Sequence, residues 1–458
     1  MPGSSVLASL VPDGLFTGWP GWDELAFLAA LAVIAVNLIW NTWLFKRSRA
    51  LREDGPVSDL GEERFTWVFL VPALDEEVTI ADSVARLLQV RCVHKRIVVI
   101  DDGSTDATPE VLAGIDHPDL VVLRREPPHA HVGKAAALND AWSRLPEIVE
   151  GIDPQRTIVC VVDADGRLAP DAPAYVSQWF ADDVVGGVQV RVRIYNRHHP
   201  LTWAQDVEFG VFAKLYQAAR ASLGTAGMGG NGQFNRLAAL DDLATRCIES
   251  GNPDAEPAGD GTVGPWRDRL TEDQDLGLRL VEAGWHCGHD NRTHVDQQGL
   301  PGLRKLLRQR TRWSQGNMQA FAHLAKVVHA PFTRRARLDL VLYLLQPLFG
   351  AVVGIGLFAS VLAAVLDGAS FVPSDLWVLV VFYFLGFGGV VLGCIARCGR
   401  GPKAWLWGWF ISPVYAAYSW ILWPVLVRAA WRQLRSESGW SKTEREAITP
   451  EDRVPAGL

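Results

Sequence analysis

Residues 25–45 contain no charged side chain, and this run limits the possible folds more than any other feature of the chain. A helix that crosses a hydrocarbon core of about 30 Å needs about 20 apolar residues. No Lys or Arg precedes the run, so it is not typical of a signal peptide. Four basic residues follow it directly, namely Lys46, Arg47, Arg49 and Arg52. The positive-inside rule therefore predicts a transmembrane helix, with residues 1–24 outside the cell and the following domain in the cytoplasm. A buried core helix is the alternative.

Residues 338–427 form a second apolar region, which we expect to be transmembrane or interfacial. Two further spans are predicted at 340–366 and 376–395, because the loop between them lacks basic residues. Residues 405–427 are also apolar but contain five Trp and two Pro, which favour an interface and break helices. This segment is either a fourth span or a bent interfacial or re-entrant segment. Basic residues in the polar tail, 428–458, favour a cytoplasmic tail and hence the bent segment.

Residues 46–300 have the composition of one globular domain, in which strand-like and helix-like segments alternate. This alternation predicts an α/β domain with a mostly parallel sheet. Ligands bind such sheets beyond the carboxyl ends of the strands. Acidic pairs stand at two of these ends, Asp101–Asp102 and Asp163–Asp165, so we expect them to share a crevice that binds a divalent cation and a diphosphate. The predicted strands are 65–71, 96–101, 121–123, 157–162 and 185–194, and the predicted helices include 77–89 and 134–145.

Several other functions lack support in the sequence. There is no GxGxxG after a strand and no GxxxxGK[ST], so neither dinucleotide nor P-loop binding is indicated. The formal net charge of −7 gives no nucleic-acid signature. Six Cys in a chain of 458 residues do not indicate a disulfide scaffold and favour a reducing compartment for the middle domain. The cluster of His286, Cys287, His289 and His294 has no common zinc spacing, so a structural role is favoured.

Each candidate motif also has a purely structural interpretation. Asp163-Ala164-Asp165 can coordinate a metal or be a chance surface pair, and Asp101-Asp102 can contact a nucleotide or form a turn. Lys134 can begin a helix or meet a phosphate. Glu272 and Asp273 can complement a helix dipole, or Asp273 can be a general base. The basic stretch 301–337 is typical of interfacial amphipathic helices.

Taken in order, the motifs are more specific than any one of them alone. The chain contains VPALDEE, VIDDGSTD, GKAAALN, VVDADG, GGNGQFNR, LTEDQDLGLRL and QRTRWSQG. Over residues 65–319 and the flanking spans it resembles the membrane-integrated family 2 glycosyltransferases, the group of cellulose, chitin and hyaluronan synthases. The resemblance implies a cytoplasmic GT-A catalytic domain with transmembrane helices on both sides. It also implies an inverting, metal-dependent enzyme of the plasma membrane that uses a UDP-sugar and Mg²⁺ or Mn²⁺.

The resemblance also implies roles for individual residues. Asp163 and Asp165 would hold the metal and diphosphate, with Asp165 the more direct ligand. Asp273, beside Glu272, would be the catalytic base. Arg312 suits diphosphate because its guanidinium can bridge phosphate oxygens. The other donor-binding residues would be Pro72, Ala73, Asp75, Glu77, Asp101, Asp102, Lys134 and Gln309, and the acceptor-binding residues would be Trp313, Gly230, Asn231 and Gly232.

The product stays open at this stage. One hypothesis is a processive synthase that extends and exports a polysaccharide, and another is single-sugar transfer to a lipid, as in ceramide glucosyltransferase-like proteins. A third is a non-catalytic partner of a synthase, which the intact carboxylates disfavour. Two departures, Asp75 where Asn is commoner and the glycine loop GGNGQF, leave the sugar and linkage undefined. Secretion partners are not identified.

Overall fold

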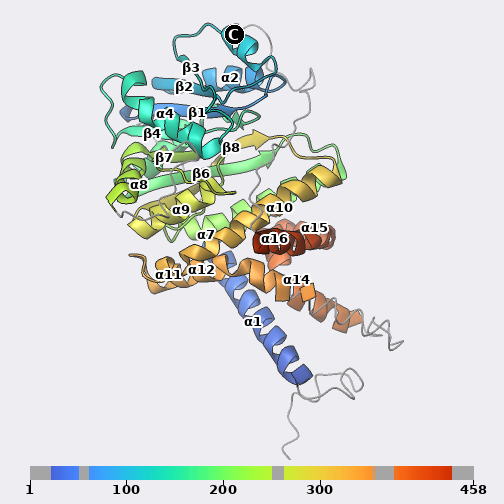
Figure 1. Cartoon of the computed structure of the whole chain (residues 1–458). Helices are drawn as coiled ribbons and strands as arrows, with labels where there is room; N and C mark the ends of the chain where they lie inside the picture. Colours follow the sequence, from blue (N-terminus) through green and yellow to red (C-terminus); the bar gives the residue numbers. More distant parts are fainter. Residues whose placement is uncertain (1–21, 51–60, 250–262, 353, 356–375, 436–458) are drawn as a thin grey trace, which may run out of the picture. The chain divides into compact units, whose positions relative to one another are not determined.

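The computed structural model describes residues 22–50, 61–249, 263–352, 354–355 and 376–435 (Figure 1). The chain forms two units. The larger comprises Trp43–Pro347 and Val390–Leu458, and the smaller comprises Met1–Thr42 and Leu348–Gly389. The α/β domain lies within the larger unit. Most of the predicted loop 251–265 lies outside the described residues.

One eight-stranded sheet forms the centre of the α/β domain (Figure 1). Its order is β3-β2-β1-β4-β7-β6-β8-β5. The strands are β1 (Thr66–Ala73), β2 (His94–Asp101), β3 (Leu120–Arg124), β4 (Thr157–Val161), β5 (Arg167–Leu168), β6 (Val185–Ile194), β7 (Gln233–Arg236) and β8 (His286–Gln297).

Apolar side chains cover both faces of the sheet. In β1, Val68 and Leu70 face one core cluster, whereas Trp67 and Phe69 face the other. This division follows from the two-residue side-chain period of a strand. Helices pack on both clusters, and a sheet buried on both faces needs such helices. One face packs against α4 (Lys134–Ile148), α8 (Leu237–Glu249) and α9 (Glu272–Ala283), and the other against α2 (Ile80–Leu88), α3 (Thr108–Ala113) and α5 (Ala172–Phe180).

The sheet is more mixed than the sequence predicts. Strands β1, β2, β3 and β4 are parallel, as are β6 and β8. Strand β7 runs antiparallel to both β4 and β6, and β5 runs antiparallel to β8. The sequence analysis missed β5, β7 and β8 because two are very short and β8 is largely polar, without apolar alternation.

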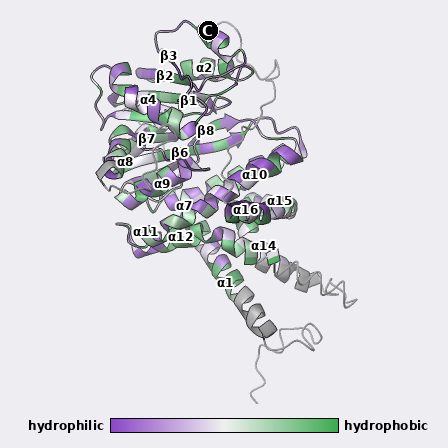
Figure 2. Cartoon of the chain, viewed as in Figure 1, coloured by the Kyte–Doolittle hydropathy of each residue, from purple (hydrophilic) through white to green (hydrophobic). Residues whose placement is uncertain are grey.

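A helical layer follows strand β6. Helix α6 (Pro200–Val211) continues into the π-helical turn η2 (Phe212–Gln217) and then α7 (Ala218–Ala221). The predicted amphipathic stretch 301–337 is also helical, and its first helix, α10, is largely hydrophilic (Figure 2). This stretch contains α10 (Leu303–Gln319), η3 (Ala320–His323), α11 (Leu324–Val327) and the first residues of α12 (Arg334–Leu344).

The predicted membrane spans are only partly supported. Helices α1 (Trp22–Ser48) and α14 (Leu376–Cys398) cover two of them. The prediction that a span begins at Leu340 is wrong, because Leu340 and Leu344 of α12 pack into the core of the α/β domain. Within the described residues, the one helix long and apolar enough to cross a membrane is Pro402–Leu434. Spans on both sides of the domain therefore lack support.

Residues 405–427 lie in two consecutive helices, and the choice between a fourth span and a bent segment stays a prediction. Pro413 lies inside helix α15 (Pro402–Ile421), whereas Pro424 begins helix α16 (Trp423–Leu434) after a turn at Leu422. Helix α16 lies beside α10 and buries Val425 and Ala429 (Figure 1). The location of the tail stays a prediction, since residues 436–458 lie outside the described residues.

Candidate active site

A cavity of about 520 Å³ lies at the carboxyl ends of the central parallel strands. It brings together residues from β1, the turn after β4, and the N-termini of α4 and α9, as well as α10. Most of the predicted site residues line it: Pro72, Ala73, Asp102, Lys134, Asp163, Asp165, Glu272, Asp273, Gln309, Arg312 and Trp313. Six others do not, namely Asp75, Glu77, Asp101, Gly230, Asn231 and Gly232.

The acidic pair after β2 has two different environments. Asp101 is 1% exposed, pairs with Arg124 and accepts the Ser104 backbone N–H at 2.9 Å. Asp102 pairs with Arg125 and lines the cavity. Burial raises the pKa of Asp102, although the paired Arg125 opposes this effect. Asp102 can therefore contact a ligand directly, whereas Asp101 supports the turn that carries it.

Asp75 and Glu77 stabilise a loop and lie outside the lining of the cavity, and their donor contact stays a prediction. The Asp75 carboxylate accepts the backbone N–H of Thr105 at 2.7 Å, and Glu77 accepts that of Ala107 at 2.9 Å. Asp75 has a φ of 51°, a left-handed conformation that Asp and Asn tolerate better than most residues. These contacts join the loop after β1 to the loop after β2.

Lys134 joins the two acidic motifs. Its Nζ lies 2.8 Å from Asp163 Oδ1 and 3.3 Å from Glu272 Oε1. Burial lowers the pKa of Lys134, but the two carboxylates outweigh it and raise the pKa above its ordinary value. The ammonium therefore stays charged at the point where the two motifs meet.

Asp273 has an environment suited to a general base. Burial and repulsion from Glu272 raise its pKa to about 7, with Lys134 opposing them. Its Oδ1 accepts the Gln274 backbone N–H at 2.8 Å. A Cβ at Gly230 would lie 2.9 Å from Asp273 Oδ2, and Gly230 has a φ of 75°. Glycine at 230 thus leaves room for the carboxylate.

Asn231 and Gly232 lie outside the lining of the cavity, and their acceptor contact stays a prediction. Asn231 is 1% exposed, and its Oδ1 accepts the Asp163 backbone N–H at 3.2 Å. A Cβ at Gly232 would lie 2.7 Å from Val190. Close packing therefore explains the glycines of the GGNGQF loop, and Asn231 of this loop holds the turn that carries Asp163.

Two carboxylates, Asp163 and Asp165, stand on the same cavity wall. Within the described residues, no group of three or more His, Cys, Asp or Glu side chains could hold a metal. Two carboxylates fit a hard cation that completes its shell with ligand oxygens such as those of a diphosphate. His286, Cys287, His289 and His294 lie in β8 as part of the sheet, and their structural role stays an interpretation.

Helix α10 contributes two cavity residues that the motif analysis missed, Arg310 and Asn317. Arg310 pairs with Glu208 at 2.6 Å, and its guanidinium lies 4.2 Å from the centre of the Trp313 ring. The Arg310–Glu208 ion pair neutralises two charges of the cavity wall. The Trp313 ring packs against both the Arg310 guanidinium and the Phe209 ring. The basic composition of 301–337 was the only signal for Arg310 in the sequence.

The cavity also has an aromatic wall that sequence reasoning missed. Its residues come from α6, η2, α12 and α15, which are far apart in the sequence, so no local motif marks them. Gln217 of η2 exchanges two hydrogen bonds with the Gly227 backbone, at 2.8 and 3.0 Å, and so fixes the loop before Met228. The wall consists of Phe209, Phe212, Tyr216, Tyr343 and Tyr415, with Met228.

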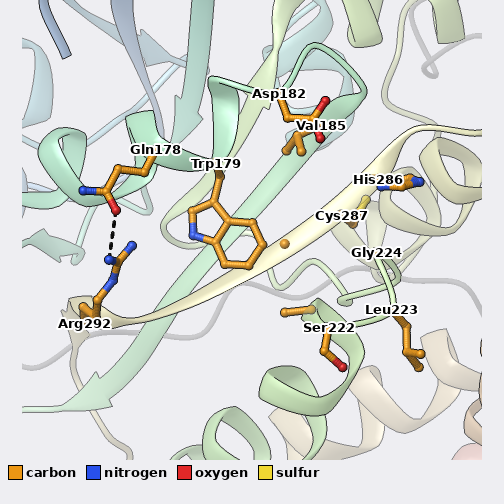
Figure 3. Close-up of a pocket in the computed structure, with 12 residues that line it drawn as sticks. Gln178, Trp179, Asp182, Val185, Ser222, Leu223, Gly224, His286, Cys287 and Arg292 are labelled. Carbon is orange, nitrogen blue, oxygen red and sulfur yellow. Dashed lines mark hydrogen bonds between the residues drawn. The ribbon is translucent and has the colours of Figure 1, made fainter. Parts of the chain in front are cut away.

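A second cavity, of about 530 Å³, lies between α5, the loop after α7 and β8 (Figure 3). Its cation, Arg292, pairs with Asp290 at 2.6 Å and donates to Gln178 at 2.9 Å. None of the predicted site residues lines this cavity. The first cavity is therefore the better candidate for catalysis.

Comparisons with known proteins give the family of the chain. A family model described as Glycosyl transferase family group 2 matches residues 158–392, just over half of the chain. A second, Glycosyl transferase family 2, matches residues 68–241.

Two curated relatives differ in the product that their names state. The chain is 29% identical over 339 residues to a beta-monoglucosyldiacylglycerol synthase of Synechocystis sp., covering 72% of this chain and 63% of the relative. It is 27% identical over 251 residues to the poly-beta-1,6-N-acetyl-D-glucosamine synthase of Staphylococcus aureus, covering 54% of this chain and 53% of the relative. The chain thus spans less than two thirds of either relative.

One solved structure shows the fold. A mannosyltransferase from Pyrobaculum calidifontis, in complex with GDP-Man and Mn²⁺, aligns with a TM-score of 0.56 at 18% identity. The alignment covers 90% of this chain and 99% of that chain. The predicted GT-A-like α/β fold is therefore confirmed.

Proposed function

The chain belongs to glycosyl transferase family group 2, and on that premise we propose that it transfers a sugar from a UDP-sugar to a hydroxyl of a membrane lipid. The observation that carries this proposal is one cavity with two chemically different walls. Carboxylates and Lys134 suit a nucleotide diphosphate and a base. Aromatic side chains that line the same cavity suit an apolar acceptor.

Transfer proceeds with inversion at the anomeric carbon. Asp273 accepts the proton of the acceptor hydroxyl while that oxygen attacks the carbon. The bond to the UDP oxygen breaks on the opposite side, and UDP leaves with the bonding electrons. A base whose pKa lies at about 7 is matched to this proton transfer at neutral pH. Lys134 and Arg312 face the same cavity and balance the charge that develops on the diphosphate.

Asp163 and Asp165 are the residues that would hold Mg²⁺ or Mn²⁺. When bound, the cation neutralises charge on the leaving diphosphate. We expect Asp165→Ala to remove metal-dependent activity and to weaken UDP binding, measured by calorimetry with and without Mn²⁺. Unchanged UDP and Mn²⁺ binding, or full wild-type activity in excess EDTA, would contradict this assignment.

Extension of a polysaccharide is the second candidate function. The match to the poly-N-acetylglucosamine synthase favours it. The aromatic wall and the matches to glucosyldiacylglycerol synthases favour the lipid acceptor.

Product analysis separates the two candidates. The full chain, in nanodiscs that contain diacylglycerol, is incubated with each of several UDP-sugars and Mn²⁺. Mass spectrometry of the lipid extract is expected to detect a glycolipid with one added sugar, which the Asp273→Asn variant fails to make. A long polymer in the aqueous phase would support the second candidate, and UDP release without either product would contradict both.

We also propose that the enzyme acts at the plasma membrane, with its catalytic domain in the cytoplasm. Support comes from the apolar exterior of α15, where Leu406, Trp407 and Phe410 are exposed. Multiple membrane crossings by α1 and α14 belong to this proposal and await cysteine-accessibility mapping in intact cells.

A further inference from the structure

Tyr343 is the residue of the aromatic wall with the most specific polar contact. It lies on α12, and its phenol oxygen accepts a hydrogen bond from Gln274 Nε2 at 2.9 Å. The Gln274 backbone N–H donates to Asp273 Oδ1 at 2.8 Å. One residue therefore fixes both the base and the Tyr343 hydroxyl in the same cavity.

Further contacts fix the orientation of each partner. Thr271 Oγ1 donates to Gln274 Oε1 at 3.2 Å, so the Gln274 amide has a defined direction. The Arg220 guanidinium lies 4.1 Å from the centre of the Tyr343 ring, and Arg220 Nε pairs with Asp339 at 2.9 Å. Both members of this pair are buried, at 1% and 0% exposure of their side chains. The ring is therefore held in place independently of any ligand.

The Tyr343 hydroxyl is oriented to donate to a ligand. Because its oxygen accepts from Gln274, its proton points to another partner, and among the described residues it donates to no other group that we observe. Burial raises the pKa of Tyr343, so the phenol keeps its proton at neutral pH. A cation over an aromatic ring withdraws electron density and strengthens the phenol as a donor.

The charges that act on Tyr343 are those of Arg220, Asp339 and Asp273, and the Asp273 carboxylate would repel an anion placed beside it. Arg220 pairs with Asp339. The surroundings of Tyr343 therefore suit an uncharged oxygen better than a phosphate or carboxylate.

We propose that Tyr343 is an acceptor-positioning residue, which donates a hydrogen bond to a second oxygen of the acceptor while Asp273 takes the proton of the reacting hydroxyl. This inference rests on the proposed lipid transfer. It identifies the acceptor class as a glycerolipid, in which an ester oxygen lies on the carbon next to the one that bears the hydroxyl. A lipid alcohol with a single isolated oxygen would lack this contact.

The test compares two acceptors and two tyrosine variants. Full-length wild type, Tyr343→Phe and Tyr175→Phe are assayed in nanodiscs with diacylglycerol or a long-chain alcohol. Tyr175 is a matched control because Arg292 lies 5.1 Å from its ring centre, far from the catalytic cavity. We expect Tyr343→Phe to raise the KM for diacylglycerol about tenfold, the value of one well-made hydrogen bond. UDP binding and the KM for the alcohol should be unchanged, and Tyr175→Phe should match wild type. The thermal midpoint of Tyr343→Phe should fall only slightly, because Gln274 Nε2 loses one acceptor.

Each other outcome is decisive. An unchanged diacylglycerol KM in Tyr343→Phe would overturn the inference, as would an equal loss with both acceptors or weaker UDP binding, which would indicate a structural role. If wild type modifies neither lipid, the proposed lipid transfer fails and this inference fails with it. Wild-type transfer to diacylglycerol with an unaffected Tyr343→Phe variant rejects the inference alone.

Discussion

The carboxylate wall and the aromatic wall of the catalytic cavity differ in how the chain builds them. The first comes from strand ends and helix N-termini, where Asp163 follows β4, Lys134 begins α4 and Glu272 begins α9. The second comes from the sides of helices, with Phe212 on η2, Tyr343 on α12 and others on α6 and α15.

We expect the two walls to have different tasks, with donor chemistry at the carboxylate wall and acceptor binding at the aromatic wall. Strand ends hold charged groups at fixed positions, because parallel strands terminate along one edge of the sheet. Helix sides present apolar surface whose shape depends on packing, so this wall can change to suit another acceptor without altering the donor site. We therefore expect substitutions in the first wall to affect turnover with every acceptor, and substitutions in the second to affect acceptor affinity.

Asp273→Asn should have the largest effect. Loss of a positioned base typically lowers turnover by roughly 10²–10⁴-fold. UDP binding should persist, because Asp273 is needed only to take the acceptor proton. Single-turnover kinetics and calorimetry check the two parts. Turnover within tenfold of wild type would remove Asp273 from the base role.

Lys134→Met should follow in size. The ammonium balances Asp163 and Glu272 in the resting site and the diphosphate during transfer. Loss of one such preorganised contact lowers turnover by roughly 10²–10³-fold. The loss should be equal with every acceptor tested. A change confined to the acceptor KM would show that the two walls are not separate in function.

Phe212→Ala tests the aromatic wall. Phe212 is 39% exposed. Removal of its ring should weaken the binding free energy of the lipid by about 1–2 kcal/mol and raise the lipid KM about tenfold. Donor affinity and the rate of UDP-sugar hydrolysis without acceptor should stay at wild-type values. A parallel fall in UDP affinity would contradict the division between the walls.

The last prediction concerns stability rather than activity. The pKa of Asp273 is raised to about 7 in the folded chain, so folding opposes ionisation of this carboxyl. Asp273 therefore lowers the free energy of unfolding more and more as the pH rises from the ordinary pKa of 3.8 towards 7. Asn cannot ionise, so the stability advantage of Asp273→Asn should widen by about 2 kcal/mol between pH 5 and pH 8. Thermal unfolding at both pH values measures this gap. A constant gap would show that burial and Glu272 do not raise this pKa.

Much of the carboxylate wall was predictable from residues alone. The strands before Asp102 and Asp163 each have a local signature, and the sequence placed both acidic pairs in one crevice. The sequence did not show the loop contacts of Asp75 and Asn231, because a motif does not reveal whether a polar side chain faces the cavity or a neighbouring loop. In the folded chain both accept backbone N–H groups.

The sequence by itself determined the α/β domain, the acidic strand ends and the basic helix α10, since strand period, turn residues and charge are local properties. Only the tertiary structure decided the antiparallel strand β7, the π-helical turn η2 and the contact between Tyr343 and Gln274. Tyr343 and Gln274 are 69 residues apart. Contacts over that distance depend on how helices pack against the sheet, and packing leaves no periodic signal in either segment.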